Sequence, residues 1–181
     1  MKILSLHCDY IKFKPIKKAL KKPEELSEER KKEIKIENPL VIMIAVEKQD
    51  EKNPKLIKQL TDEIISITNQ IKTKKIVLYP YAHLSSNLSA PDFALKTFEQ
   101  AEQALKKLKF QIIRAPFGYY KELELKVKGH PLSELSREIK LSGEIYEKTE
   151  KYDTKQLSRE ISRTKLDTRK LKDNDHRILG Q

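Results

Sequence analysis

The sequence predicts an α/β fold, and three segments near the middle of the chain carry that prediction. Residues 40–46 form a nearly uninterrupted apolar run, which is typical of a strand buried on both faces. Asn53 and Pro54 then supply an N-cap and a proline at the first helical position, and isoleucine and leucine recur at helical spacing as far as Ile71. A second short apolar run at residues 76–79 completes a βαβ-like unit.

The segments before this unit predict strands and a charged excursion. Residues 2–8 and 10–15 cluster or alternate apolar residues over strand lengths, with Asp9 between them. We therefore expect a strand followed by a bend or by a hairpin partner. Residues 19–37 are dominated by charge and hold too few apolar side chains to bury a face, so we interpret them as a surface excursion with helical turns.

A polar loop at residues 80–86 leaves the second strand of the unit. Pro91 then opens a second helix, whose apolar positions recur as far as Leu108. Ligands of α/β sheets gather at the carboxyl ends of strands, where backbone donors and helix amino ends are available. This loop is therefore a candidate site.

Residues 115–121, Ala-Pro-Phe-Gly-Tyr-Tyr-Lys, predict a tight turn between the apolar runs 110–114 and 123–127. The turn should place Tyr120 and Lys121 at the lip of a β-hairpin. A lysine held beside aromatic rings is partly desolvated, which lowers its pKa and makes it a candidate for activating or positioning a water molecule. The alternative is an ordinary hairpin with a solvated lysine.

Two segments complete the chain. Residues 128–131 predict the start of a short helix that carries Glu134 near its first turn, where a carboxylate also suits the helix dipole. The same helix would carry Leu135 and Ile139. From Lys140 onward apolar residues become sparse and no strand pattern returns, so we expect a linker or helical arm.

Length and charge indicate the class of protein. A chain of 181 residues can bury one good core and hold something extra. Its 38 Lys and Arg against 27 Asp and Glu give a net charge of +11, which favours a polyanionic partner and above all nucleic acid. Lysine-rich composition also arises from proteome-wide bias, as in thermophiles. No apolar run approaches the roughly 20 residues of a membrane span, so we expect a cytoplasmic protein.

The cysteine and histidine content predicts neither a disulfide nor a metal site. Cys8 has no partner for an internal disulfide, and we expect it to be a small buried hydrophobe rather than a reactive thiol. The four histidines lack the spacing of zinc ligands. The sequence also has no Gly-rich phosphate loop, nucleophile elbow or CxxC pair, so nucleotide binding and covalent catalysis have no motif behind them.

Five motifs occur in order along the chain. They are His-Cys-Asp-Tyr at 7–10, Val-Glu-Lys at 46–48, Tyr-Pro-Tyr-Ala-His-Leu-Ser-Ser at 79–86, Ala-Pro-Phe-Gly-Tyr-Tyr-Lys at 115–121 and Lys-Gly-His-Pro-Leu-Ser-Glu-Leu-Ser at 128–136. Together they resemble the amino-terminal editing domain of archaeal threonyl-tRNA synthetases over residues 1–139. The charged excursion before Asn38 departs from the family, and we take it as variable surface that leaves the site unaffected.

Residues 175–180, Asp-His-Arg-Ile-Leu-Gly, resemble the start of the synthetase's class II catalytic domain. The resemblance therefore divides the chain into an editing domain at 1–139, a charged linker or helical arm at 140–174, and the start of the missing catalytic domain at 175–181. The chain is accordingly expected to be a piece of a longer protein.

The resemblance implies a fold like that of D-aminoacyl-tRNA deacylases, which is an α+β mixed sheet with packed helices, and a homodimer with the site near its interface. The implied reaction is proofreading by hydrolysis of the ester in seryl-tRNA(Thr). Such a step is needed because one methyl group separates serine from threonine by only about 1–3 kcal/mol. The resemblance implies no cofactor for editing, whereas ATP and zinc belong to the missing catalytic domain, with which the full-length protein would ligate threonine to tRNA(Thr).

The resemblance also implies roles for particular residues. Lys121 would activate or position the attacking water, and His83 would complete the catalytic pair while helping to hold the substrate. The 2′-hydroxyl of the terminal ribose would take part in the chemistry. The residues that would bind the seryl group and the terminal adenosine are Tyr120, Glu134, Pro80, Tyr81, Ala82 and Phe117.

Two other functions are weighed against this one. A free-standing D-aminoacyl-tRNA deacylase is disfavoured by the synthetase-like tail and by the lack of the Gly-Pro dipeptide that this family uses against L-substrates. A non-catalytic tRNA-binding appendage is disfavoured by the intact Lys121 and His83. His7 and His130 are evenly balanced between a site role and a structural one, since His130 could cap the last predicted helix.

Overall fold

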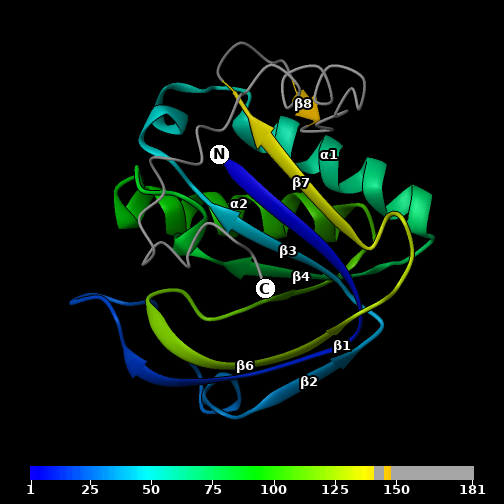
Figure 1. Ribbon diagram of the computed structural model, residues 1–181. Helices are drawn as coiled ribbons and strands as arrows, with labels where there is room; N and C mark the ends of the chain where they lie inside the picture. The colour runs from blue at the N-terminus through cyan, green and yellow to red at the C-terminus, as the bar shows by residue number, and fades with distance from the viewer. Residues whose placement is uncertain (141–144, 148–181) are drawn as a thin grey trace, which may run out of the picture. The chain divides into compact units, whose positions relative to one another are not determined.

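The computed structural model describes residues 1–140 and 145–147 (Figure 1). Within these ranges one mixed sheet has the strand order β5-β4-β3-β1-β7-β8, and β2 and β6 also pair with β1. The strands are β1 Lys2–Lys18, β2 Ile34–Glu37, β3 Leu40–Ala45, β4 Lys75–Pro80, β5 Gln111–Arg114, β6 Tyr119–Val127, β7 Glu134–Ile139 and β8 Ile145–Glu147. The helices are α1 Leu56–Ile71 and α2 Pro91–Lys107, with short 3-10 turns η1 Glu29–Lys31, η2 Lys48–Lys52 and η3 Ala82–Leu84.

This architecture confirms the expected fold class. Strands β3, β4 and β5 are parallel, whereas β1 is antiparallel to each of its four partners, so the sheet is mixed. Neither helix in the described ranges is long and apolar enough to cross a membrane.

Strand β3 is buried at every position, as its unbroken apolar run predicted. Its alternate residues divide between two apolar clusters. Ile42 and Ile44 pack in the helix-side core with side chains of α1 and α2, while Val41 and Met43 pack in the strand-side core. The sheet thus has helices on one face and its own folded-over strands on the other.

The fold-over is produced by β1, which was expected as two strands around Asp9 and is one long strand. Its pairing register with β6 shifts between Cys8 and Tyr10, which marks a β-bulge. A one-residue shift exchanges the faces of a strand. As a result Leu6 and Cys8 before the bulge, and Ile11 and Phe13 after it, all point into the strand-side core. Figure 1 shows β1 bending away from β3 and β7 to run between β2 and β6.

Both of the long predicted helices are present, and the sequence placed the start of α2 more accurately than the start of α1. Helix α2 begins at Pro91, in agreement with the sequence. Helix α1 begins at Leu56 rather than at Pro54, so the predicted cap is wrong by two residues. The Asn53 side chain instead accepts a hydrogen bond from the Lys55 backbone at 3.0 Å, which forms a turn ahead of the helix.

The hairpin predicted around residues 115–121 is wrong. Strand β5 pairs in parallel with β4, and β6 pairs with β1, so the two flanking runs are not partners. The turn is determined by residues close together in the sequence, whereas the pairing of each flanking strand is determined by distant segments of the chain. The first run, β5, pairs with the free edge of β4, and the second run, β6, pairs with the second half of β1.

The short helix predicted from residues 128–131 is also wrong, because Glu134–Ile139 is strand β7. It pairs with the first half of β1 from Lys2 opposite Glu138 to Leu6 opposite Glu134. Those backbone groups of β1 would otherwise lack a partner on that side. Strand β8 follows at Ile145–Glu147, where no strand was expected. The remainder of the predicted arm, including the catalytic-domain start at 175–181, lies outside the described residues.

The two-faced core predicts unequal effects for two isoleucines on β1. Ile11 is fully buried in the strand-side core, whereas Ile16 is 62% exposed. We expect Ile11→Ala to lower the free energy of unfolding by about 2–5 kcal/mol. Ile16→Ala, the matched control, should change it by no more than about 0.5 kcal/mol. Urea denaturation measures both, and equal effects would contradict the described bend of β1.

Candidate functional site

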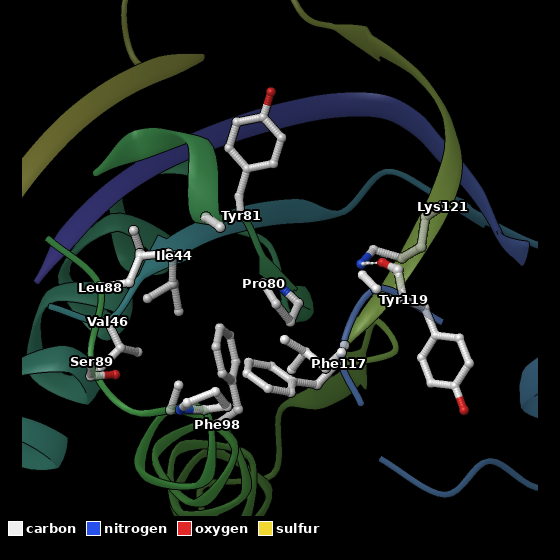
Figure 2. A pocket seen from close by; sticks show the side chains of 17 residues that line it. Ile44, Val46, Pro80, Tyr81, Leu88, Ser89, Phe98, Phe117, Tyr119 and Lys121 are labelled. Carbon is white, nitrogen blue, oxygen red and sulfur yellow. Dashed lines mark hydrogen bonds between the residues drawn. The ribbon is translucent and has the colours of Figure 1, made fainter. Parts of the chain in front are cut away.

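A cavity of about 210 Å³ opens where the carboxyl ends of β3 and β4 meet the first turns of α2 (Figure 2). The loop after β4, which the sequence marked as a candidate site, forms one wall. The turn before β6 and the segment after β1 form the other. The lining residues are Ala19, Leu20, Ile44, Ala45, Val46, Pro80, Tyr81, Ala82, Leu88, Ser89, Pro91, Ala94, Phe98, Phe117, Gly118, Tyr119 and Lys121.

The cavity is mostly apolar and holds one charged side chain among its lining residues, that of Lys121. Figure 2 shows the rings of Phe98 and Phe117 together on one side and the Lys121 ammonium group reaching in from another. The two ring centroids are 6.0 Å apart. A concave apolar pocket with few polar groups is the usual form of a small-ligand site.

Lys121 is held tightly at this site. Its Nζ donates hydrogen bonds to the carbonyl oxygens of Pro116 and Tyr119, each at 3.0 Å, and lies 5.0 Å from the centre of the Tyr79 ring. Burial lowers the pKa of Lys121 to about 8, against the opposing influence of the Glu24 carboxylate. The predicted desolvation is therefore present, although Lys121 stands on a strand paired with β1 and not on a hairpin lip.

Glu24 anchors the turn that carries those two carbonyl groups. Its carboxylate is buried, accepts a hydrogen bond from the Phe117 backbone at 3.0 Å, and is bound by both terminal nitrogens of Arg114 at 2.8 and 2.7 Å. Arg30 also pairs with it. These contacts lower the pKa of the Glu24 carboxyl despite its burial. A charged side chain at this depth needs such complete pairing.

The segment around Glu24 closes one wall of the cavity. Gly118 has a φ of +79°, and a Cβ built on it would lie 3.0 Å from the Cα of Pro23, so any side chain at this position would be strained and crowded. The Gly118 carbonyl accepts hydrogen bonds from the backbones of Ala19 and Leu20. The expectation that the charged excursion leaves the site unaffected is therefore wrong.

The opposite wall is fastened by Glu47, which the sequence placed in a motif without giving it a role. Its buried carboxylate accepts a hydrogen bond from Ser85 Oγ at 2.6 Å and lies 3.1 Å from the Met1 amino group. That amino group also binds Asp50 at 2.7 Å. The neighbouring Val46 carbonyl accepts from the Ser89 backbone at 3.0 Å. Glu47 and Val46 thus hold the loop that follows β4.

Five of the predicted site residues converge on the cavity: Pro80, Tyr81, Ala82, Phe117 and Lys121. The other three do not line it. His83 is exposed on η3, with its ring 5.3 Å from that of Tyr81. Tyr120 is 59% exposed, and Glu134 is exposed at the start of β7. Their placement gives them no contact with the cavity of the same chain.

Glu134 is far from Lys121 along the sheet. It pairs with Leu6 of β1, whereas Lys121 pairs with Pro15, nine positions further along the same strand. Within one chain, Glu134 and Lys121 therefore lie beside different halves of β1.

His7 and His130 form a pair with each other outside the cavity. Their Nδ1 and Nε2 atoms are 2.8 Å apart, and His130 Nδ1 accepts a hydrogen bond from the Leu132 backbone at 3.3 Å. Burial, followed by the neighbouring His130, lowers the pKa of His7. The pair joins β1 to the loop before β7, which favours the structural role that the sequence left open.

Cys8 is fully buried and unpaired, as the sequence predicted, and burial raises the pKa of its thiol to about 11. Among residues 1–140 and 145–147, no group of three or more His, Cys, Asp or Glu side chains is placed to hold a metal ion.

Among known proteins, the chain is similar to archaeal threonine–tRNA ligases. The family described as the archaea-specific editing domain of threonyl-tRNA synthetase matches residues 1–139. The threonine–tRNA ligase of Thermococcus sibiricus is 48% identical over 140 residues, which are 77% of this chain and 22% of that protein. The ligase of Pyrococcus horikoshii is 41% identical over 163 residues, which are 87% of this chain and 26% of that protein. The chain thus spans about a quarter of the length of these curated relatives.

A solved structure of the c-Myc DNA Unwinding Element Binding Protein shares the fold. It has a TM-score of 0.55 and 10% sequence identity, and the match covers 76% of this chain and 98% of that one. At this identity the likeness concerns the fold alone. It agrees with the deacylase-like mixed sheet that the sequence motifs implied.

We call the Glu24 carboxylate, with its partners Arg114 and Arg30, the Glu24 clamp. The clamp predicts a measurable change in the pKa of Lys121. Because the Glu24 carboxylate raises the pKa of Lys121, Glu24→Gln should move the titration midpoint of Lys121 below its value of about 8. The same change leaves Arg114 and Arg30 without this partner, so we expect a loss of about 3–5 kcal/mol in stability. Lysine-selective NMR titration measures the midpoint, and thermal unfolding measures the stability.

Glu25 is the matched control, since it is the exposed neighbour of Glu24. Glu25→Gln should leave both quantities close to those of the unaltered chain. A folded Glu24→Gln variant whose Lys121 midpoint stays in place would show that the clamp does not act on the lysine.

Proposed function

Because the chain belongs to the archaea-specific editing-domain family of threonyl-tRNA synthetases, we propose that it hydrolyses the ester of seryl-tRNA(Thr). One observation carries this proposal. An apolar cavity, lined by residues of three of the family-like motifs, holds a single lysine whose pKa is lowered to about 8. Ester hydrolysis at neutral pH needs a positioned water and a group that can accept its proton.

The hydrogen bonds of Lys121 support a role as that acceptor. A neutral amine has two N–H donors and one lone pair. The Pro116 and Tyr119 carbonyls take two donors, so in the neutral form the lone pair remains for a ligand in the cavity. The attacking water gives its proton to Nζ as its oxygen bonds to the ester carbonyl carbon. Nζ then returns that proton to the ribose oxygen as the bond between this oxygen and the carbonyl carbon breaks, which leaves free serine and the tRNA hydroxyl. The rate should therefore rise as the pH passes through about 8.

The proposed selectivity follows from the apolar walls. Serine differs from threonine by lacking one methyl group, and a binding pocket alone gains only about 1–3 kcal/mol from such a difference. In a small cavity bounded by Ile44, Val46 and Phe98, the extra methyl group of threonine would clash with the walls, so threonine is excluded and serine is admitted. Inserting a methyl group into a packed site costs about 1–3 kcal/mol.

The RNA itself supplies the second catalytic group in this proposal. Lys121 is the one ionisable cation among the lining residues, and the His83 ring lies outside them. The 2′-hydroxyl of the terminal ribose is next to an ester on the 3′ oxygen and can donate a hydrogen bond to the developing oxyanion. His83 would then contact the nucleotide at the rim.

A second copy of the chain would bring Tyr120 and Glu134 to the site. Both are exposed and neither lines the cavity of its own chain, yet both belong to motifs that match the family. In a homodimer with the site near the interface, each copy would offer these side chains to the other copy's substrate. Two-fold symmetry would then create two equivalent composite sites.

The remaining parts of the proposal concern the whole protein. A longer threonine–tRNA ligase would contain a catalytic domain that uses ATP and zinc to attach threonine to tRNA(Thr), and editing would need neither. The cytoplasm would be its location. Hydrolysis of a D-aminoacyl-tRNA in preference to seryl-tRNA(Thr) would instead assign the site to a D-aminoacyl-tRNA deacylase.

Lys121→Met should lower the rate of seryl-tRNA(Thr) deacylation by about 100-fold, since general-base catalysis typically contributes that much or more. It should also remove the rise in rate near pH 8. Deacylation of radiolabelled seryl-tRNA(Thr) against pH measures both. Lys126→Met, on the same strand and solvent-exposed, is the control.

Folding must be checked in the Lys121→Met variant, because Lys121 is partly buried and makes two hydrogen bonds. A circular dichroism spectrum like that of the unaltered chain provides this check. Deacylation by a folded variant at the original rate would rule out Lys121 as the base.

The composite site predicts complementation between two inactive variants. Lys121→Met and Glu134→Ala should each be nearly inactive alone. A mixed dimer restores one site that holds both original residues, so random mixing should recover about one quarter of the original activity. Mixing after mild dissociation, with rates measured on seryl-tRNA(Thr), tests this. No recovery in a mixture shown to contain mixed dimers would place Glu134 elsewhere.

A further inference from the structure

Four lysines flank the cavity wall that follows β1, and the proposed chemistry does not use them. Lys17 and Lys18 end β1, and Lys21 and Lys22 follow after two residues. All four are exposed. We call this segment, residues 17–22, the lysine strap. The two residues between the lysine pairs, Ala19 and Leu20, line the cavity itself.

The strap is fixed to the site by backbone contacts. Lys17 and Lys18 pair with Tyr120 and Tyr119 of β6, and the Gly118 carbonyl accepts hydrogen bonds from the two residues that follow. The backbone of the strap is therefore held beside the cavity, and its four lysines directly flank the two residues that line it.

These charges are not neutralised within the described part of the chain. Some lysines elsewhere on the surface have carboxylate partners, such as Lys12 with Glu33 and Lys58 with Asp62. The described residues place no carboxylate within ion-pairing distance of the strap lysines. The nearest acidic residue in sequence, Glu24, is buried against Arg114.

The opposite wall has a different charge character. Residues 80–95 form that wall and contain no lysine or arginine. A polyanion that enters the cavity therefore meets cations on the strap side, whereas the other wall offers no lysine or arginine and carries the exposed carboxylate of Asp92. This asymmetry gives the ligand a direction.

We propose that the lysine strap binds the phosphates of single-stranded RNA immediately 5′ of the nucleotide whose ester enters the cavity. This inference rests on the proposed function, since it assumes an RNA-linked substrate, and it adds the surface over which the RNA leaves. Lysines bind phosphates as point charges and gain free energy from counterion release. A terminal nucleotide seated at Lys121 puts its 5′ phosphate at the cavity mouth.

The experiment compares two variants with the same change in charge. In the strap variant Lys17, Lys18, Lys21 and Lys22 are all changed to Gln. In the control variant Lys72, Lys74, Lys107 and Lys109 are changed to Gln. These are also exposed, but they lie at the carboxyl ends of α1 and α2 and before β4 and β5, at the other end of the sheet from the cavity.

Two substrates separate phosphate binding from chemistry. Seryl-tRNA(Thr) carries the phosphates, whereas 3′-O-seryladenosine carries the same ester without them. We expect the strap variant to lose about 10-fold or more in kcat/KM on seryl-tRNA(Thr) at moderate salt, and to keep its rate on seryladenosine. The control variant should lose much less on the tRNA.

Binding of uncharged tRNA(Thr) at several salt concentrations gives an independent measurement. The slope of log affinity against log salt should fall in magnitude by up to about 3 in the strap variant, at about 0.7 for each single-strand phosphate. Equal slopes in the strap and control variants would overturn the proposal. Loss of seryladenosine hydrolysis in the strap variant would also overturn the proposal, because it would show that the strap lysines maintain the structure of the site rather than bind phosphates.

The proposed function and the strap can fail separately. If the unaltered chain hydrolyses neither substrate, the proposed function is wrong, and the salt slopes still decide whether the strap binds RNA. If the strap variant loses binding to polyglutamate but keeps the tRNA slope, the strap serves an acidic protein and the proposal is overturned.

Discussion

Strand β1 hydrogen-bonds to four other strands, and the position of the cavity depends on how it does so. Its first half completes the sheet next to β3, and its second half leaves that sheet to pair with β2 and β6. The bulge between Cys8 and Tyr10 makes this possible without exposing apolar side chains, because it exchanges the two faces of the strand at the bend. The end of β1 and the start of β6 then arrive together beside the carboxyl ends of β3 and β4.

Features that depend on local sequence could be predicted, and features that depend on distant partners could not. The apolar run of β3 and the proline at the start of α2 determine their elements within a few residues of chain. The segment that became β7 alternates too weakly to indicate a strand alone, and it becomes one because the edge of β1 lacks a partner. Likewise, the turn at Gly118 was visible, but the partners of the strands on either side were not.

The residues of the site also differ in whether local sequence or distant partners determine their role. Pro80, Phe117 and Lys121 lie in motifs whose order along the chain indicated their role, and the structure brings them to one cavity. Glu24 had no such signal, since it is one carboxylate in a charged run and its importance comes from Arg114, 90 positions away. Burial of an acid is decided by the partners that the fold supplies, so composition alone pointed to the surface instead.

The lowered pKa of Lys121 has a consequence beyond hydrolysis. With a pKa of about 8, roughly one molecule in ten carries a neutral Lys121 amine at pH 7, against roughly one in 2,500 for a lysine at the usual value of about 10.4. A neutral amine is a nucleophile. Lys121 is therefore a chemical handle in a chain rich in lysine, where acylating or aldehyde probes small enough to enter the cavity could label one position. The same property makes a carbonyl-reactive group on a seryladenosine scaffold a rational starting point for a covalent inhibitor.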